Sequence, residues 1–233
     1  VSMKLQNAIT VTEATKRNVD NALSYTDTQD SALESVADIL DRMSTIKTSY
    51  GSGTATTSDK SSYASEFKEL QKQLDVFKSE TFNSLSLFSS STVSKQVTIS
   101  TRGDSGPTIS ISSLDISGAL SVSSTINLAN ATGSVTISGI SIGNLTTAIT
   151  QVASLRATSG ATSSRLQFSS DFLDTSKTNL EAANSRIMDV DIADEVTNYA
   201  KYNVQVYAAS AALAQSNLNM GIVLDLLNFG SSR

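Results

Sequence analysis

Cysteine, histidine and tryptophan are absent from this 233-residue sequence, and proline occurs once. Without cysteine there is no disulfide, no thiolate nucleophile and no cysteine-ligated metal. Without histidine the commonest general base and the commonest zinc ligand are missing as well. Serine hydrolases with a histidine triad, zinc hydrolases and cysteine proteases are therefore excluded, while carboxylate pairs, lysine chemistry and carboxylate-bound metals stay open.

Positive charge and long apolar runs are also scarce. The chain has 17 Lys and Arg against 22 Asp and Glu, a net charge of -5, which leaves no basic field for a nucleic acid. No stretch reaches the roughly 20 apolar residues of a membrane helix, and the start at Val1–Leu5 lacks the apolar core of a signal peptide. We expect neither a nucleic-acid nor a membrane partner.

The first 77 residues carry two helical hydrophobic patterns on either side of a polar turn at Gly51–Thr54. Gaps of three, four and seven between apolar residues predict a helix from Val1 to about Tyr50 and a second helix after the turn, packed as an antiparallel hairpin. The predicted core positions are Val19, Leu23, Thr26, Leu33, Val36, Leu40, Met43, Ile46 and Tyr50, then Tyr63, Phe67, Leu70, Leu74 and Phe77.

Between about Phe82 and Gly143 the apolar period changes to two, and glycines separate the short runs. This pattern predicts short strands, each with one apolar face, in a small β-rich insertion. The predicted strands are Val97–Ile99, Ile109–Ile111, Leu114–Ile116, Leu120–Val122 and Val135–Ile137.

Helical spacing returns from Leu145 to about Leu227, with no glycine between Ala161 and Met220. A helical run of this length cannot bury its stripe against itself, so it needs the N-terminal helices as partners. We therefore expect a mainly α fold, in which both chain ends form a long antiparallel, coiled-coil bundle and a small β-rich domain is inserted in the middle. The expected divisions are an N-terminal bundle part at 1–88, a variable β-rich domain at 89–143, a C-terminal bundle part at 144–190 and a C-terminal core helix at 191–233.

The segment Val196–Phe229 is apolar or small on nearly every helical face and has almost no charge after Lys201. A helix that is apolar all round is buried on all sides, and a chain end offers little to bury it. Its burial is therefore expected to be intermolecular. The predicted polymerisation and chaperone-binding residues are Val196, Val204, Val206, Leu213, Leu218, Ile222, Val223, Leu224, Leu226 and Leu227.

The acidic cluster Asp189, Asp191, Asp194 and Glu195 is the strongest candidate for a metal or acid–base site. Its spacing lacks the glycine and terminal glutamate of a calcium loop. Carboxylates near a helix start are instead stabilised by the free backbone N–H groups there, which favours a capping role. We predict no catalytic, cofactor-binding or metal-binding residue, and no enzymatic activity.

Three ordered motifs connect the C-terminal half to a known family. They are Ser185–Asp191 with Ala193–Val196, then Leu213–Asn217 (Leu-Ala-Gln-Ser-Asn), then Val223–Leu227 (Val-Leu-Asp-Leu-Leu). Together they resemble bacterial flagellins, in which they mark the joint before the C-terminal core helix and the closing pattern of that helix. In the N-terminal half, Val1–Leu5 is similar to the start of the family's outer long helix, and Thr81–Asn83 is similar to its Gln-Phe-Asn turn.

The resemblance implies a structural subunit of the flagellar filament that self-assembles through its terminal helices for swimming motility. It implies an extracellular location reached through the flagellar type III export apparatus. The implied partners are other copies of the chain, a flagellin export chaperone on the C-terminal segment, and hook-associated and cap proteins. It also implies that a first core helix of roughly 40 residues, about 60 Å long, precedes Val1 in a complete subunit.

Arg42, within Leu40–Ser44, matches an arginine of the flagellin motif that innate immune receptors recognise. Thr45 and Ile46 stand where that motif usually has Glu-Leu, so a solvated charge on the helix face is the competing interpretation.

Two other functions also stay open, a hook–filament junction protein and an adhesin module displayed on coiled-coil arms. The second is disfavoured because none of the 6 Tyr and 7 Phe lies between Ser89 and Gln167.

Overall fold

The computed structural model describes residues 1–91, 93–100, 106–123, 126–129, 132, 135–188 and 192–230. The chain forms two compact units, one of Val1 with Met3–Ala182 and one of Ser2 with Ala183–Arg233. The first contains a helical bundle with its β segments, and the second is dominated by one long helix.

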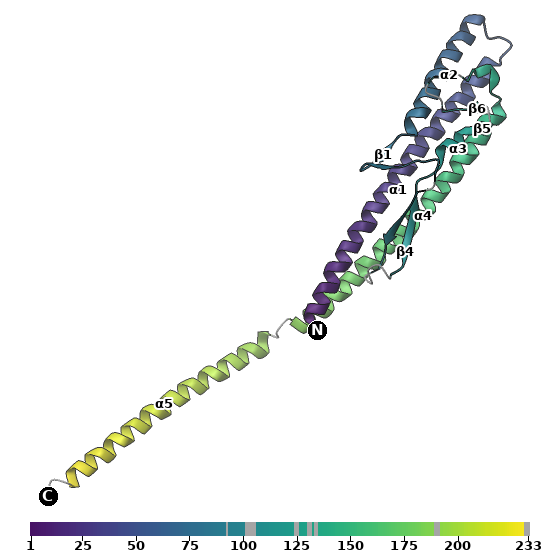
Figure 1. Cartoon of the computed structure of the whole chain (residues 1–233). Helices are drawn as coiled ribbons and strands as arrows, with labels where there is room; N and C mark the ends of the chain where they lie inside the picture. The colour runs from purple at the N-terminus through teal and green to yellow at the C-terminus, as the bar shows by residue number, and fades with distance from the viewer. Residues whose placement is uncertain are drawn as a thin grey trace. The chain divides into compact units, whose positions relative to one another are not determined.

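Helices α1 (Ser2–Tyr50) and α2 (Thr57–Phe77) form the predicted hairpin of the first unit (Figure 1). The turn between them ends in a capping box. Asp59 N–H donates to the Thr56 hydroxyl at 3.2 Å, and Thr56 N–H donates to the Asp59 carboxylate at 2.9 Å. Two backbone donors that the helix start leaves unpaired are thereby satisfied, which fixes where α2 begins.

Helix α4 (Ile142–Met188) lies beside α1 and runs antiparallel to it (Figure 1). Three cross-helix ion pairs show the direction, because α4 numbers fall as α1 numbers rise. Lys177 pairs with Glu13 at 2.8 Å, Asp174 with Lys16 at 3.3 Å, and Arg156 binds both carboxylate oxygens of Asp30 at 3.1 Å. The hydrogen bond that Lys16 donates to Asp174 raises the pKa of Lys16, and the hydrogen bonds that Arg156 donates to Asp30 raise the pKa of Arg156.

The core of the first unit follows the predicted stripes. Leu33, Leu40 and Leu74 are fully buried, and so are Val152 and Leu166 of α4. Among the other predicted core positions, Leu23, Tyr50, Tyr63, Leu70 and Phe77 are partly buried and pack on the edge of the same cluster. The antiparallel helical bundle and the small central β region confirm the predicted fold class.

The β segments form three separate two-stranded antiparallel sheets. The first joins β1 (Thr81–Phe82) and β2 (Leu85–Ser86). Its two-residue turn has positive φ at both central positions, 48° at Asn83 and 63° at Ser84, as a tight hairpin turn requires. The other two pair β3 (Ser94–Thr98) with β4 (Thr108–Ser112) and β5 (Ser121–Ser123) with β6 (Ile126–Asn127).

The buried amide of Gln29 connects the helices to the β segments. Its Nε2 donates to the carbonyl of Leu87 at 2.7 Å and to that of Ser112 at 3.3 Å. From α4, the Ser159 hydroxyl donates to the carbonyl of Thr26 at 3.2 Å. The sequence pattern did not indicate these polar core residues, because the backbone carbonyls to which they donate lie far away in the chain.

Two of the predicted strands are wrong. At Leu114–Ile116 the Asp115 carboxylate accepts the Gly118 N–H at 2.8 Å, which starts the short helix α3 (Ile116–Leu120) instead. At Val135–Ile137 the chain makes the 3-10 turn η2 (Ile137–Gly139), whose Ile137 carbonyl accepts from Lys47 Nζ at 2.9 Å. In both cases local capping or a tertiary contact outweighs the alternating pattern.

The second unit contains α5 (Ile192–Gly230), the last helix of the chain. Residues 189–191, between α4 and α5, lie outside the described part. None of the described helices combines the length and the apolar character needed to cross a membrane.

Two buried glutamines are expected to respond in opposite ways to the same substitution. Both side-chain polar atoms of Gln71 lack a hydrogen-bond partner among the described residues, whereas Gln29 is paired. Gln71→Leu should raise the free energy of unfolding by about 1–3 kcal/mol, the cost of an unpaired buried polar group, and Gln29→Leu should lower it by a similar amount. Urea unfolding followed by near-ultraviolet circular dichroism measures both, and equal effects would contradict the assignment.

The Glu13–Lys177 pair is expected to give a pH-dependent contribution to stability. The hydrogen bond from Lys177 lowers the pKa of Glu13 from its ordinary value of 4.5. A lowered folded-state pKa stabilises the fold above the unfolded value, and this contribution is lost as the pH falls through the lowered value. Glu13→Gln should therefore lower the Tm slightly at about pH 7, and this effect should shrink as the pH falls through the lowered pKa of Glu13. Glu80→Gln, at an exposed position, is the control.

Candidate assembly surface

Helix α5 is continuous over 39 residues, and most of its charged residues lie near its start. Asp194 and Glu195 lie in the first turn, where carboxylates interact favourably with the helix dipole. Beyond Lys201 the only charged residue of the helix is Asp225. Asp194 thus lies near a helix start, while Asp189 and Asp191 lie outside the described residues, so the capping role stays a prediction.

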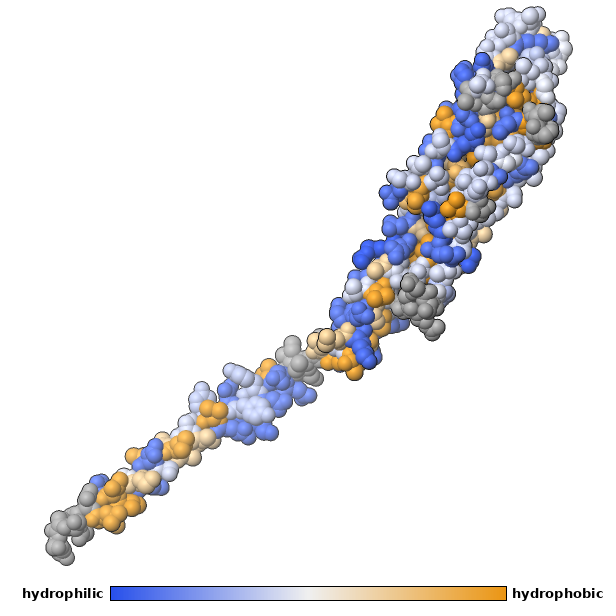
Figure 2. Space-filling view, in the orientation of Figure 1, coloured by the Kyte–Doolittle hydropathy of each residue, from blue (hydrophilic) through white to orange (hydrophobic). Residues whose placement is uncertain are grey.

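All ten predicted contact residues of α5 are exposed in the single chain. Their relative exposure runs from 57% at Val223 and Leu224 to 75% at Leu226. At 3.6 residues per turn, the ten positions point in directions that cover the whole circumference of the helix. Figure 2 shows hydrophobic side chains along the visible face of α5. No single neighbouring surface could bury a helix of this kind, so covering it requires contacts on several sides.

Small residues make this helix suited to close packing. Ala208, Ala209, Ala211, Ala212 and Ala214 fall within seven positions and are all exposed. Alanine gives a helix a narrow profile and a low entropic cost on burial, so neighbouring helices can approach closely.

Several exposed residues were not among the predicted contacts. Tyr199, Tyr202 and Tyr207 are 64% to 75% exposed, and Met220 is 64% exposed. Buried tyrosines need a partner for the hydroxyl, so this part of α5 presents a mixed aromatic and polar surface, unlike the aliphatic end. Counting aromatic and methionine side chains along the helix, and not aliphatic residues alone, could have indicated these positions.

Arg42 lies on α1 with its side chain 56% exposed and bound to a neighbouring helix. Its Nη2 lies 2.6 Å from Glu66 Oε1, and its Nε donates to the same oxygen at 2.7 Å. This exposed ion pair with α2 fits the interpretation of Arg42 as a solvated charge on the helix face. The guanidinium already has a carboxylate partner within the chain.

The described residues hold no group of three or more carboxylates placed to bind a metal ion. The exposed surface of α5 combines aliphatic side chains with hydroxyls and amides such as those of Ser210, Gln215 and Asn219.

Comparison with known proteins places both ends of the chain in one family. The N-terminal helical region of bacterial flagellin matches residues 1–92, and the C-terminal helical region of bacterial flagellin matches residues 142–227. Flagellin of Halalkalibacterium halodurans is 26% identical over 228 residues, which is 97% of this chain and 82% of that protein.

Solved structures agree with this assignment. The crystal structure of Bacillus cereus flagellin has 27% identity and a TM-score of 0.55, covering 72% of this chain and 94% of that one. A structure described as a flagellar hook-associated protein from Vibrio parahaemolyticus has a TM-score of 0.64 at 12% identity, over 79% of this chain and 95% of that one, so it shows the fold alone. The flagellin sequence relationships favour the filament over the hook–filament junction.

Because the flagellin helical regions match on both sides of the β segments, the chain belongs to the bacterial flagellin family, whose members are structural subunits that polymerise into the flagellar filament.

Proposed function

We propose that α5 is the segment through which this subunit packs against its neighbours in the filament. The observation that supports this role is the exposure of the ten aliphatic residues, 57% to 75%, around the whole helix. In this proposal 191–233 is the core helix, 1–88 and 144–190 form the bundle outside it, and 89–143 is the variable β-rich domain. The subunit performs no reaction.

The energetics explain why one contact is not enough. Burying a Val, Leu or Ile side chain stabilises by about 1.5–3 kcal/mol, so ten of them are worth on the order of 15–30 kcal/mol. Losing the freedom of one subunit costs about 4–15 kcal/mol before any side chain is ordered. A single neighbour covers only one face of α5, so the free energy of burial exceeds the cost of association by little. Neighbours on several sides bury more side chains, and the net stabilisation is then large. The helix therefore favours a polymer over a dimer.

The same surface requires protection before assembly. An exposed aliphatic helix at high concentration in a cell is an aggregation hazard. We propose that a flagellin export chaperone binds α5 until the subunit passes through the flagellar export apparatus. Outside the cell, the hook-associated and cap proteins contact the same helical ends at the limits of the filament.

Placing a charge on α5 is expected to abolish assembly without unfolding the monomer. Leu218 is 63% exposed, so Leu218→Glu leaves the monomer's helix content unchanged. In the filament the carboxylate would be buried without a partner, which is strongly unfavourable. Val76→Glu, at a 52% exposed apolar position on α2, is the matched control. Electron microscopy of cells producing each variant should show filaments only for the control, and filaments in both would refute the role of α5.

The chaperone proposal is tested by light scattering with the chain at fixed concentration. Mixing with a flagellin export chaperone should give a 1:1 complex, and a chain lacking 196–233 should give none. The truncated chain must keep the Tyr25 near-ultraviolet signal of the bundle, which shows that it is folded. A complex that persists after truncation would locate chaperone binding elsewhere.

A further inference from the structure

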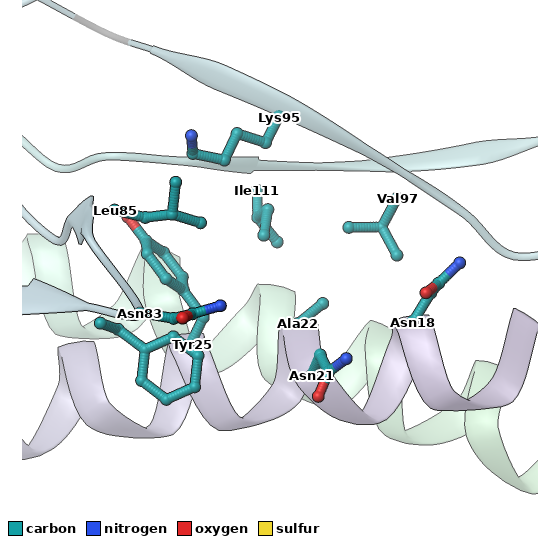
Figure 3. A pocket seen from close by; sticks show the side chains of 10 residues that line it. Asn18, Asn21, Ala22, Tyr25, Asn83, Leu85, Lys95, Val97 and Ile111 are labelled. Carbon is teal, nitrogen blue, oxygen red and sulfur yellow. The ribbon is translucent and has the colours of Figure 1, made fainter. Parts of the chain in front are cut away.

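An open pocket lies between α1 and the β3–β4 hairpin of the first unit, with a volume of about 320 Å³ (Figure 3). Ala22 of α1 and Ile111 of β4 are buried at its base, and Val97 of β3 points into the same space. The remaining lining residues are Asn18, Asn21, Tyr25, Phe82, Asn83, Leu85 and Lys95.

The pocket combines an apolar interior with one cationic group. Lys95 and Val97 are two residues apart on β3 and therefore share the face turned toward α1. Within the part of the chain that the structure describes, the Lys95 ammonium makes no ion pair, and the amides of Asn18 and Asn21 lie along the helix side. The pocket is thus suited to an apolar group that carries a negative charge beside it.

A complementary feature lies on α4. Phe168 and Phe172 are 75% and 68% exposed, one helical turn apart, although Leu166 and Leu173 beside them are buried. Asp171 lies between them in the sequence and on the adjoining side of the helix, and its exposed carboxylate accepts through Oδ1 only a hydrogen bond from Gln167 at 3.0 Å among the described groups. We refer to Phe168, Asp171 and Phe172 as the aromatic knob.

The knob and the pocket lie at the same height along the bundle. Ser170 donates to Asp20 at 3.0 Å, and Asp174 pairs with Lys16 at 3.3 Å, so residues 168–172 of α4 are level with about 18–22 of α1. The pocket is lined by α1 residues from Asn18 to Tyr25. Two copies placed side by side can therefore bring the knob of one to the pocket of the other with little shift along the bundle axis.

We propose that the pocket of one subunit receives the aromatic knob of a neighbouring copy in the filament, with Asp171 of the knob paired to Lys95 of the pocket. This proposal rests on the filament function given above. An apolar cavity of roughly 150 Å³ holds a benzene molecule, so the pocket is large enough for a phenyl ring. A contact between two different surfaces of the same molecule does not close on itself and repeats from copy to copy, as a filament requires.

We call this contact between the aromatic knob and the pocket of a neighbouring copy the interlock. Exchanging the charges of its ion pair tests it. Asp171→Lys and Lys95→Asp each place like charges together, so either should raise the critical concentration for assembly of purified subunits by about tenfold. The double variant Asp171→Lys with Lys95→Asp should restore assembly to near the unmodified level. Asp171 is exposed and Lys95 is half-buried, and circular dichroism of the monomers checks that folding is unchanged. Normal assembly of the single variants, or no rescue in the double one, would overturn the interlock.

The absence of cysteine allows an independent test of proximity. Asn21→Cys and Thr175→Cys in one chain, the second at an exposed position one helical turn beyond Asp171, should give a ladder of covalent multimers on a denaturing gel when filaments are treated with a short bis-maleimide. The pair Asn21→Cys with Ser65→Cys, whose second position is exposed on α2, is the matched control and should stay monomeric. A ladder in the control alone, or in neither, would overturn the interlock.

These outcomes are distinct from failure of the α5 role. If Leu218→Glu abolishes filaments while the charge variants assemble normally, α5 drives assembly and the interlock is wrong. If Leu218→Glu filaments form, the proposed function of α5 fails, and the charge-exchange and ladder results still decide the interlock.

Discussion

The antiparallel packing of α1 on α4 is the contact on which the other parts of the first unit depend. Neither helix can bury its apolar stripe alone, and together they enclose a row of fully buried residues that includes Leu33, Val152 and Leu166. Ion pairs from Glu13–Lys177 to Asp30–Arg156 hold the two helices at one register. The β segments are too short for independent stability, and they are fixed by that register because Gln29 binds the carbonyls of Leu87 and Ser112.

In α5 the same physical requirement is left unfulfilled within the chain. A helix with aliphatic residues around its whole circumference has no preferred side to turn toward one partner. In the proposed function, association with neighbours therefore completes the burial that folding leaves undone. Binding that occurs only to the folded, assembled form also stabilises that form by mass action. In the function proposed above, folding of the bundle and packing of α5 against neighbouring subunits are consequently two stages of one burial process.

The helices could be predicted from the sequence because their signal is repeated over many turns, as in the series Leu33, Leu40 and Leu166, Leu173. The short strands could not be predicted reliably. Leu114–Ile116 alternates like a strand, yet Asp115 caps a helix, and Ile137 adopts a turn held by Lys47. Gln29 and Ser159 were missed because their partners lie more than 50 residues away. The proposed assembly residues of α5 were named from their apolar pattern alone, whereas Phe168 and Phe172 were missed because they stand outside the heptad positions.

The two proposed contacts supply different things to a filament. Aliphatic burial along α5 is strong but indifferent to register, because Leu, Val and Ala side chains can pack in several neighbouring arrangements with similar energy. An aromatic group in a shaped pocket, with Asp171 facing Lys95, tolerates one arrangement, since displacement leaves a charge unpaired and a ring exposed. We then expect α5 to supply most of the affinity between subunits, and the knob-in-pocket contact of the bundle to fix their relative geometry. This division explains why a subunit whose bundle buries its other large aromatics fully or partly would keep two phenylalanine rings in water as a monomer.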